Sequence, residues 1–220
     1  VLPLALLLLL AACDRIDDPI LKGNGPTPPP SGDVQRKVLL EEYTGHKCPT
    51  CPEAHAVAQQ LSDLYGDRLV IVSEHVSSLA NPEVGHYSTD FRTPEGNAYY
   101  AHWYTDIIPR GRVDRTLFNN NVILTKVDWN DAVSAELAKT ADVKVNFDAF
   151  TYDSGTHQVS TTVTCTILNP VDHALNLTVQ LIEDHVTDWQ YDADVTPPDV
   201  PDYDHRHVLR GNLNGIWGEA

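Results

Sequence analysis

The spacing of apolar residues divides the chain into two parts with different periods. In residues 37–141, two apolar runs typical of buried parallel strands, Val38–Tyr43 and Leu69–Val76, flank a segment with helical spacing. That spacing predicts a helix over residues 54–65, with Gly66 at its C-terminal end. Strand, helix and strand in this order form a βαβ unit, whose crossover is right-handed in nearly all proteins. The first part of the chain therefore reads as an α/β domain.

Two further helices and a short strand are predicted in this part. Thr93-Pro94 has the form of an N-cap followed by proline in the first turn, which indicates a helix to about residue 104. Residues 128–141 carry apolar side chains at helical spacing and predict another helix. Between the two, Ile108-Pro109 leads into a strand.

From residue 142 the period changes from helical to two. Segments 143–149, 159–167 and 175–181 alternate apolar and polar residues, which predicts antiparallel strands and the start of an immunoglobulin-like β-sandwich. Cys165 falls on the apolar face of the second segment, so we expect a small buried core residue there. We interpret residues 142–220 as a sandwich domain that is truncated at its C-terminus.

The first 36 residues predict export rather than a folded domain. Residues 1–12 are almost wholly apolar but shorter than the about 20 residues that span a bilayer, and they are interpreted as a lipoprotein signal sequence. Cys13 follows small residues, as in a bacterial lipobox, and is the predicted lipidation site. Residues 13–36, rich in proline and glycine, would then form the lipid anchor and its tether.

The composition is acidic, with a formal net charge of -16. Such a charge opposes binding to nucleic acid or anionic lipid, both of which require clustered lysine and arginine. Residues 188–204 combine aspartate with proline and predict a solvated loop. Their aspartates lack the spacing and glycine of a known Ca²⁺ loop, so no metal site is expected there.

The candidate chemistry lies in Cys48-Pro49-Thr50-Cys51, at the junction between the first strand and the helix. A Cys-x-x-Cys in a βαβ unit is the thioredoxin-like arrangement. Unpaired N–H groups and the positive end of the helix dipole favour a thiolate at Cys48, which would be the nucleophile. Cys51, one helical turn further on, would be the resolving thiol that releases a mixed disulfide.

Two other interpretations of the cysteine pair stay open. Zinc bound by Cys48, Cys51 and His46 or His55 is the weaker one, because no second ligand pair occurs at finger spacing. The other is a structural disulfide in a binding or surface-assembly protein, because fold alone does not settle function.

Several motifs spread along the chain point to one family. They are Glu42-Tyr43-Thr44-Gly45-His46 with Cys48-Pro49-Thr50-Cys51-Pro52, Asp90-Phe91-Arg92-Thr93-Pro94, Arg112-Val113-Asp114-Arg115 and Tyr203-Asp204-His205-Arg206-His207-Val208-Leu209-Arg210. Together they resemble the lipoprotein family related to the 28-kilodalton outer membrane protein of Bacteroidetes-type bacteria. The resemblance implies a thioredoxin-like domain, a β-sandwich and a lipid anchor, without a particular substrate.

The resemblance to thioredoxin-like domains implies roles for three more residues. Pro109 matches the cis-proline that packs against the two cysteines in such domains, and the main chain of Ile108 could pair with an extended substrate. Glu42, six places before the first cysteine, matches an acidic residue that could take a proton from Cys51. A surface ion pair is the other interpretation of Glu42 on sequence alone.

The sequence thus predicts an envelope lipoprotein of the outer membrane, and its first candidate activity is thiol-disulfide exchange with thiols or disulfides of exported proteins. The catalytic residues would be Cys48, Cys51 and Glu42, the substrate platform Ile108 and Pro109. No cofactor, metal or nucleic acid is expected. The alternative is a non-catalytic binding lipoprotein, and the direction of any redox chemistry is not determined by the sequence.

Overall fold

The structure is a computed structural model that describes residues 34–220. The predicted signal sequence, Cys13 and residues 13–33 of the predicted tether lie outside the described residues. Within the described part, no helix is long and apolar enough to cross a membrane.

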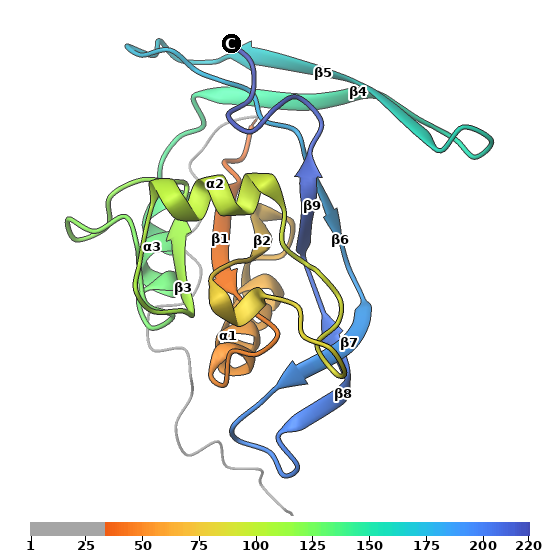
Figure 1. Cartoon of the computed structure of the whole chain (residues 1–220). Coiled ribbons are helices and arrows are strands. Elements are labelled where there is room, and N and C mark those ends of the chain that lie inside the picture. The colour runs from red at the N-terminus through yellow and green to blue at the C-terminus, as the bar shows by residue number, and fades with distance from the viewer. Residues whose placement is uncertain (1–33) are drawn as a thin grey trace, which may run out of the picture.

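A mixed five-stranded sheet of order β3-β1-β2-β9-β6 forms the centre of the molecule (Figure 1). Strands β1 (Val38–Thr44) and β2 (Leu69–His75) are parallel, as the βαβ pattern predicts. Strand β3 (Arg110–Val113) runs antiparallel to β1. On the other side, β9 (Val208–Asn212) is parallel to β2, and β6 (Gln180–Glu183) is antiparallel to β9. The sheet therefore combines strands from both parts of the chain.

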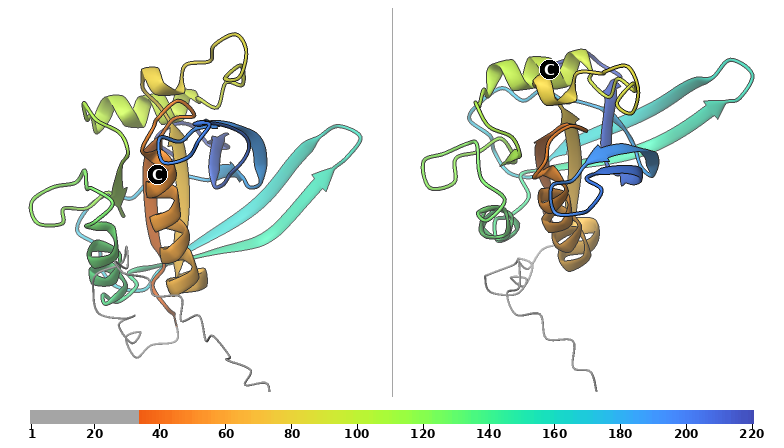
Figure 2. Two further views of the ribbon diagram at one scale, coloured as in Figure 1. Left: turned by 90° about the horizontal axis from the view of Figure 1, so that it is seen from below. Right: turned by 60° about the horizontal axis from the view of Figure 1, so that its bottom comes forward.

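Helices cover both faces of this sheet, and all three were predicted. Helix α1 (Cys51–Tyr65) connects β1 to β2 and shares a core with α3 (Trp129–Leu137). Helix α2 (Pro94–His102) lies on the opposite face (Figures 1 and 2). Short 3₁₀ helices, η1 (Gly66–Arg68) and η2 (Ser78–Ala80), follow α1 and β2.

The two cores follow from the alternation of side chains along the strands. Leu40 of β1 and Ile71 of β2 point toward α1 and α3, where Trp129 is fully buried. Leu39 and Val72, one position away, belong to the cluster under α2. The sheet is buried on both faces, which explains the continuous apolar runs in the sequence.

Residues 143–167 form a long hairpin rather than part of a packed sandwich. Strands β4 (Val143–Asp153) and β5 (Gln158–Ile167) pair antiparallel as predicted, but project from the body (Figures 1 and 2). The predicted third strand pairs elsewhere: β6 bonds to β9 in the central sheet. Within residues 34–220 no second sheet packs on the hairpin, so Phe147 and Phe150 are 65% and 66% exposed.

The expectation that Cys165 is buried is therefore wrong: it is a free, exposed cysteine on β5. Its alternating neighbours do form a strand, but alternation identifies only the face of a strand. Whether that face is buried depends on a second layer, which the described residues do not supply.

The predicted acidic loop at residues 188–204 is also corrected. Most of it belongs to a second hairpin, β7 (Val186–Tyr191) and β8 (Asp199–His205), which lies near the start of α1 (Figure 1). In β8 the exposed Asp202 and Asp204 alternate with Tyr203 and the buried His205. The aspartates occupy the solvent face of a strand, and the prolines at its start hid that period.

A close approach between β3 and α3 gives a test of this packing. A Cβ atom on Gly111 would lie 2.9 Å from the ring of Trp129, so Gly111→Ala requires the helix or strand to shift. We expect the free energy of unfolding to fall by about 1–3 kcal/mol, the usual cost of overpacking, in urea titrations followed by tryptophan fluorescence.

Gly155→Ala in the β4–β5 turn is the matched control, because its Cβ would meet only an Asp153 carboxyl oxygen at 3.3 Å. That variant should change stability by less than about 0.5 kcal/mol. Equal stabilities for Gly111→Ala and the parent protein would contradict the described packing of α3 on β3.

Candidate functional site

Cys48 and Cys51 form a disulfide at the N-terminal end of α1. Cys51 is the first residue of the helix, and Cys48 lies in the turn before it, where its N–H donates to the Gly45 carbonyl at 2.9 Å. Both cysteines are 0% exposed. The strand-to-helix position predicted for the pair is confirmed, and its sulfur atoms are closed from solvent.

Apolar side chains from five parts of the chain surround the disulfide. The cluster consists of Tyr43, Val76 and Ile108, with Leu79, Tyr100 and Ile123 packed against it. The Ile108–Pro109 peptide bond is cis, as the thioredoxin-like resemblance implies. Cys48 Sγ lies 3.9 Å from the Ile108 carbonyl oxygen. The structure thus brings Cys48, Cys51 and Ile108 together, as the sequence predicted.

Segment η2 packs closely against residues 45–51, which we call the cysteine turn. The Lys47 N–H donates to the Leu79 carbonyl at 3.0 Å, and the Lys47 ammonium pairs with Glu83. Any Cβ on Gly45 would lie 2.7 Å from the main chain of Leu79. A glycine is therefore required where the turn passes η2.

Glu42 lies on the face of β1 that points toward α1, and it is 2% exposed. Its Oε1 accepts a hydrogen bond from the Ser73 hydroxyl at 2.6 Å, while its Oε2 has no partner within residues 34–220. Burial raises the pKa of Glu42 to about 7, and the Ser73 bond offsets only part of this effect. A surface ion pair, the other interpretation of this residue, is excluded by its burial.

Glu41, the neighbour of Glu42, points to the opposite face and has a different environment. Its carboxylate accepts hydrogen bonds from Arg112 at 2.9 Å and from Arg115 at 2.6 Å. Arg112 also donates to Glu74 at 2.5 Å, and it lies over the rings of Tyr43 and Trp103. Burial acts against ionisation of Glu41, but the two arginines hold its pKa below the usual value.

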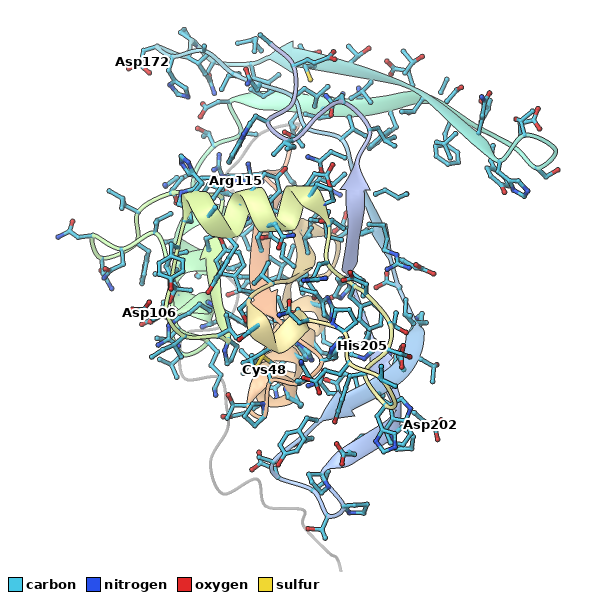
Figure 3. All side chains as sticks on the ribbon, in the orientation of Figure 1. Cys48, Asp106, Arg115, Asp172, Asp202 and His205 are labelled. Carbon is cyan, nitrogen blue, oxygen red and sulfur yellow. A yellow bond between two sulfur atoms is a disulfide. The ribbon has the colours of Figure 1, made fainter. Side chains whose placement is uncertain are left out.

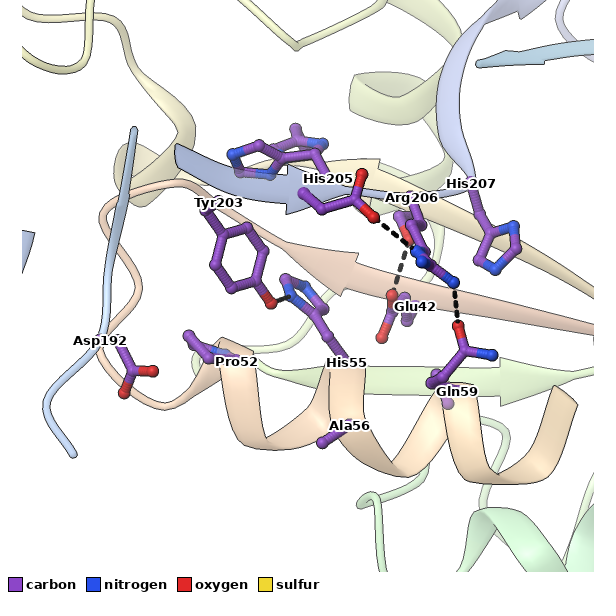
Figure 4. Close-up of a pocket in the computed structure, with 14 residues that line it drawn as sticks. Glu42, Pro52, His55, Ala56, Gln59, Asp192, Tyr203, His205, Arg206 and His207 are labelled. Atoms are coloured by element: carbon purple, nitrogen blue, oxygen red, sulfur yellow. Dashed lines mark hydrogen bonds and ion pairs between the residues drawn. The ribbon is translucent and has the colours of Figure 1, made fainter. Parts of the chain in front are cut away.

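A cavity of about 410 Å³ lies between α1, the β1–β2 face and β8 (Figure 4). Glu42 and Pro52, the residue after Cys51, both line it, so the carboxyl and the cysteine turn share this space. On the α1 side, His55 hydrogen bonds with the Tyr203 hydroxyl at 2.6 Å and with the Thr44 hydroxyl at 2.7 Å.

Buried histidines gather around this cavity, and no pattern in the sequence indicates their proximity. His75 of β2 and His205 of β8 have ring centroids 5.6 Å apart, with Phe91 in contact with both. Neither ring nitrogen of His75 has a hydrogen-bond partner within residues 34–220. Burial lowers the pKa of His55 and of His205 to about 4, and that of His75 well below its usual value. These imidazoles are uncharged near neutral pH.

The zinc interpretation gains no support from this arrangement. His55 already uses both ring nitrogens in hydrogen bonds, and the ring of His46 stacks on Tyr87. Across residues 34–220, no group of three or more His, Cys, Asp or Glu side chains has the geometry of a metal site.

The β7–β8 hairpin completes the site, and sequence reasoning missed it. Gln190 of β7 is 0% exposed, and its side-chain amide donates to the Cys48 carbonyl at 3.1 Å. Figure 3 labels Cys48 near the start of α1 and His205 on the β7–β8 hairpin. A glutamine in an acidic stretch 142 residues away carries no sequence signal for this contact.

A family model decides the relationship of the chain to known proteins. The model of outer membrane protein Omp28 matches residues 96–220, more than half of the chain. The chain belongs to the Omp28 family. The Omp28 match begins in α2 and includes β3, α3 and both hairpins, whereas the cysteine pair precedes the matched residues. Membership associates the protein with the outer membrane.

Other comparisons add little to the Omp28 assignment. No curated protein matches the chain. A crystal structure of a protein from Agrobacterium tumefaciens, a structural genomics target, aligns with a TM-score of 0.45 and 14% identity. The alignment covers 83% of this chain and 73% of that one, and a likeness at this level carries no argument about fold or function.

The buried histidines predict a pH-dependent stability. In the unfolded chain His205 binds a proton below a pH of about 6.5, whereas in the folded protein it binds one only below about pH 4. The free energy of unfolding therefore decreases as the pH falls between these two values. Between about pH 7 and about pH 5, His205→Gln should lose about 2 kcal/mol less unfolding free energy than the parent protein.

The measurement is urea unfolding at both pH values, with His173→Gln, at an exposed histidine, as the control. Buried Glu42 and Glu74 respond to pH in the opposite sense, but equally in all three proteins, so the difference isolates His205. The same pH dependence in His205→Gln and the parent would show that His205 is not held neutral.

Proposed function

We propose that the protein is a thiol-disulfide exchange lipoprotein of the outer membrane that acts on exported proteins. Residues 37–141 would be a thioredoxin-like domain, and Cys13 the lipid attachment site. The observation that carries this proposal is the Cys48–Cys51 disulfide at a strand-to-helix junction, packed against Ile108, whose peptide bond to Pro109 is cis. The sandwich assignment of residues 142–220 stays a prediction: β4 and β5 pair antiparallel as it requires, but β6 pairs with β9 in the central sheet.

In the oxidising direction a substrate thiolate attacks Cys48 Sγ, and the Cys48–Cys51 bond breaks. The electron pair of the substrate sulfur forms the new bond to Cys48, and the electron pair of the broken Cys48–Cys51 bond stays on Cys51, which leaves as a thiolate and takes up a proton. A second substrate thiolate then attacks the first substrate sulfur. It forms the product disulfide and releases Cys48 as a thiolate, which the N-terminal end of α1 stabilises.

In the reducing direction the Cys48 thiolate attacks a substrate disulfide, and Cys51 resolves the mixed disulfide that results. Cys51 must lose its proton for this second attack. Glu42 suits that task because a carboxyl with a pKa of about 7 is partly ionised near neutral pH. Glu42 lines the same cavity as Pro52, the residue after Cys51, and would release the proton into that space.

Ile108 and Pro109 would form the platform for an extended substrate segment. Ile108 is 8% exposed and its carbonyl faces Cys48 Sγ, so a peptide bonded to this main chain would bring its sulfur to the disulfide. Lys47 stands next to Cys48, and its charge would favour acidic side chains on the substrate.

A second candidate function rests on the burial of the pair. Because both cysteines are 0% exposed, the disulfide also fits a structural role in a surface protein that binds a partner. In that case the pair would resist reduction, and the function would lie in the surfaces of the two hairpins.

The reduction potential separates these two candidates. For an exchange enzyme we expect a potential above about −230 mV in glutathione buffers, measured by thiol alkylation of the fragment from Gly32 onward. Insulin reduction should be lost in Cys48→Ser and retained in a variant of the exposed cysteine, Cys165→Ser. A pair that stays oxidised below about −300 mV would instead establish the structural role.

The role of Glu42 has its own test. Glu42→Gln keeps the shape of the side chain and a bond to Ser73 but cannot accept a proton. Resolution of a mixed disulfide by Cys51 should slow by about 10²-fold, and the rate should lose its inflection near pH 7.

The measurement is single-turnover release of a fluorescent thiol from the mixed disulfide over a range of pH. Glu53→Gln, at an exposed carboxylate of α1 that pairs with Lys126, is the control and should keep the inflection. An unchanged profile in Glu42→Gln would exclude this carboxyl as the proton acceptor.

A further inference from the structure

The β7–β8 hairpin is bonded to the main chain of the cysteine turn. The Tyr191 N–H donates to the His46 carbonyl at 2.8 Å, and the Ala193 N–H donates to the Pro49 carbonyl at 3.1 Å. The Cys48 carbonyl, which lies between those of His46 and Pro49 in the sequence, accepts a hydrogen bond from Gln190 Nε2. Three consecutive parts of the turn thus depend on a segment more than 140 residues away for their hydrogen bonds.

Aromatic contacts hold the rest of the hairpin. Trp189 stacks on His86, with ring centroids 3.7 Å apart and planes within 2°. Tyr203 bonds to His55 of α1, and the Tyr87 hydroxyl donates to Asp199. His205 of β8 is buried against Phe91 and His75, so the hairpin is held by polar groups and by rings.

The contacts of the β7–β8 hairpin with the cysteine turn differ in kind from those of the other segments that surround the disulfide. Leu79, Tyr100, Ile108 and Ile123 pack as apolar side chains in the cluster around the two cysteines, but residues 186–205 add no apolar side chain to it. The hairpin can therefore leave the turn by exchanging hydrogen bonds with water, without opening the apolar cluster.

Thiol exchange requires such a movement. An incoming sulfur must reach Cys48 Sγ, yet both cysteines are 0% exposed. The side-chain amide of Gln190 donates to the Gly45 carbonyl at 3.4 Å and to the Cys48 carbonyl at 3.1 Å. Both carbonyls belong to the cysteine turn that carries this sulfur. As long as these bonds hold, the turn stays in its buried position.

We propose that Gln190 is a positioning residue for the disulfide: it clamps the cysteine turn in the closed position, and undocking of the β7–β8 hairpin gives access to Cys48. The proposal rests on the proposed exchange function for its purpose. Its physical content, control of access to the disulfide, is testable with a small thiol alone.

The test replaces the donor with an acceptor of the same shape. Gln190→Glu places carboxylate oxygens against the Cys48 and Gly45 carbonyls, and Ala193→Pro removes the donor to Pro49 without truncating a side chain. In the full chain, dithiothreitol should reduce the Cys48–Cys51 disulfide of each variant about tenfold faster than that of the parent protein, as measured by alkylation and mass spectrometry.

Gln158→Glu is the matched control: it makes the same change of charge on an exposed glutamine of β5 and should leave the rate unchanged. Reduction rates in low concentrations of urea distinguish the routes. Opening of the hairpin alone gives a rate insensitive to urea, whereas global unfolding gives a rate that rises steeply with it.

Faster, urea-insensitive reduction of Gln190→Glu or Ala193→Pro would support the clamp. Rates within about twofold of the parent, or acceleration only through the urea-sensitive route, would overturn it. Insulin turnover is measured separately. A parent protein without turnover whose Gln190→Glu variant is still reduced faster would refute the exchange function while leaving the clamp in place.

Discussion

The burial of three carboxyl groups in the two central strands is the constraint on which the rest of the structure depends. Glu41 and Glu42 are adjacent in β1, so alternation sends them to opposite faces, and Glu74 of β2 joins Glu41. A buried charge requires a partner, and β3 supplies Arg112 on that face. On the other face, within residues 34–220, Glu42 is bonded to Ser73 and pairs with no lysine or arginine. The same sheet therefore holds one carboxylate ionised for stability and leaves the other free to titrate beside the cysteine turn.

The cysteine turn is built from segments that are far apart in the sequence, and each contributes a different kind of contact. The end of β1 and the start of α1 place the two sulfurs, η2 passes so close that Gly45 is required, and the cis bond before Pro109 brings the Ile108 carbonyl to Cys48. The β7–β8 hairpin supplies the hydrogen bonds that the turn cannot make within itself. Burial of the disulfide is thus a property of the whole fold rather than of the Cys-x-x-Cys motif.

Local patterns predicted the parts of the molecule that local forces determine. The βαβ unit, the three helices and the position of the cysteine pair follow from periodicity and capping, and Pro109 followed from resemblance. Long-range partners were missed. The period of two at Cys165 shows which face of a strand it occupies, but not that this face stays uncovered, and the prolines near Asp199 hid a strand whose partner is β7. The contact of Gln190 with Cys48 depends on how the hairpin docks, which leaves no trace in spacing or composition.

The uncharged state of the histidines and the titratable state of Glu42 depend on each other. A positive charge close to a carboxyl lowers its pKa, so a protonated imidazole at the cavity would hold Glu42 ionised near neutral pH. Burial of His55, His75 and His205 prevents that protonation, and Glu42 keeps a pKa of about 7. His207, which is less buried and pairs with Asp184, is the histidine whose charge acts on Glu42, in the direction of a lower pKa. The aromatic and imidazole rings packed under β8 therefore also keep positive charge away from the carboxyl that would accept the proton of Cys51 in the proposed exchange reaction.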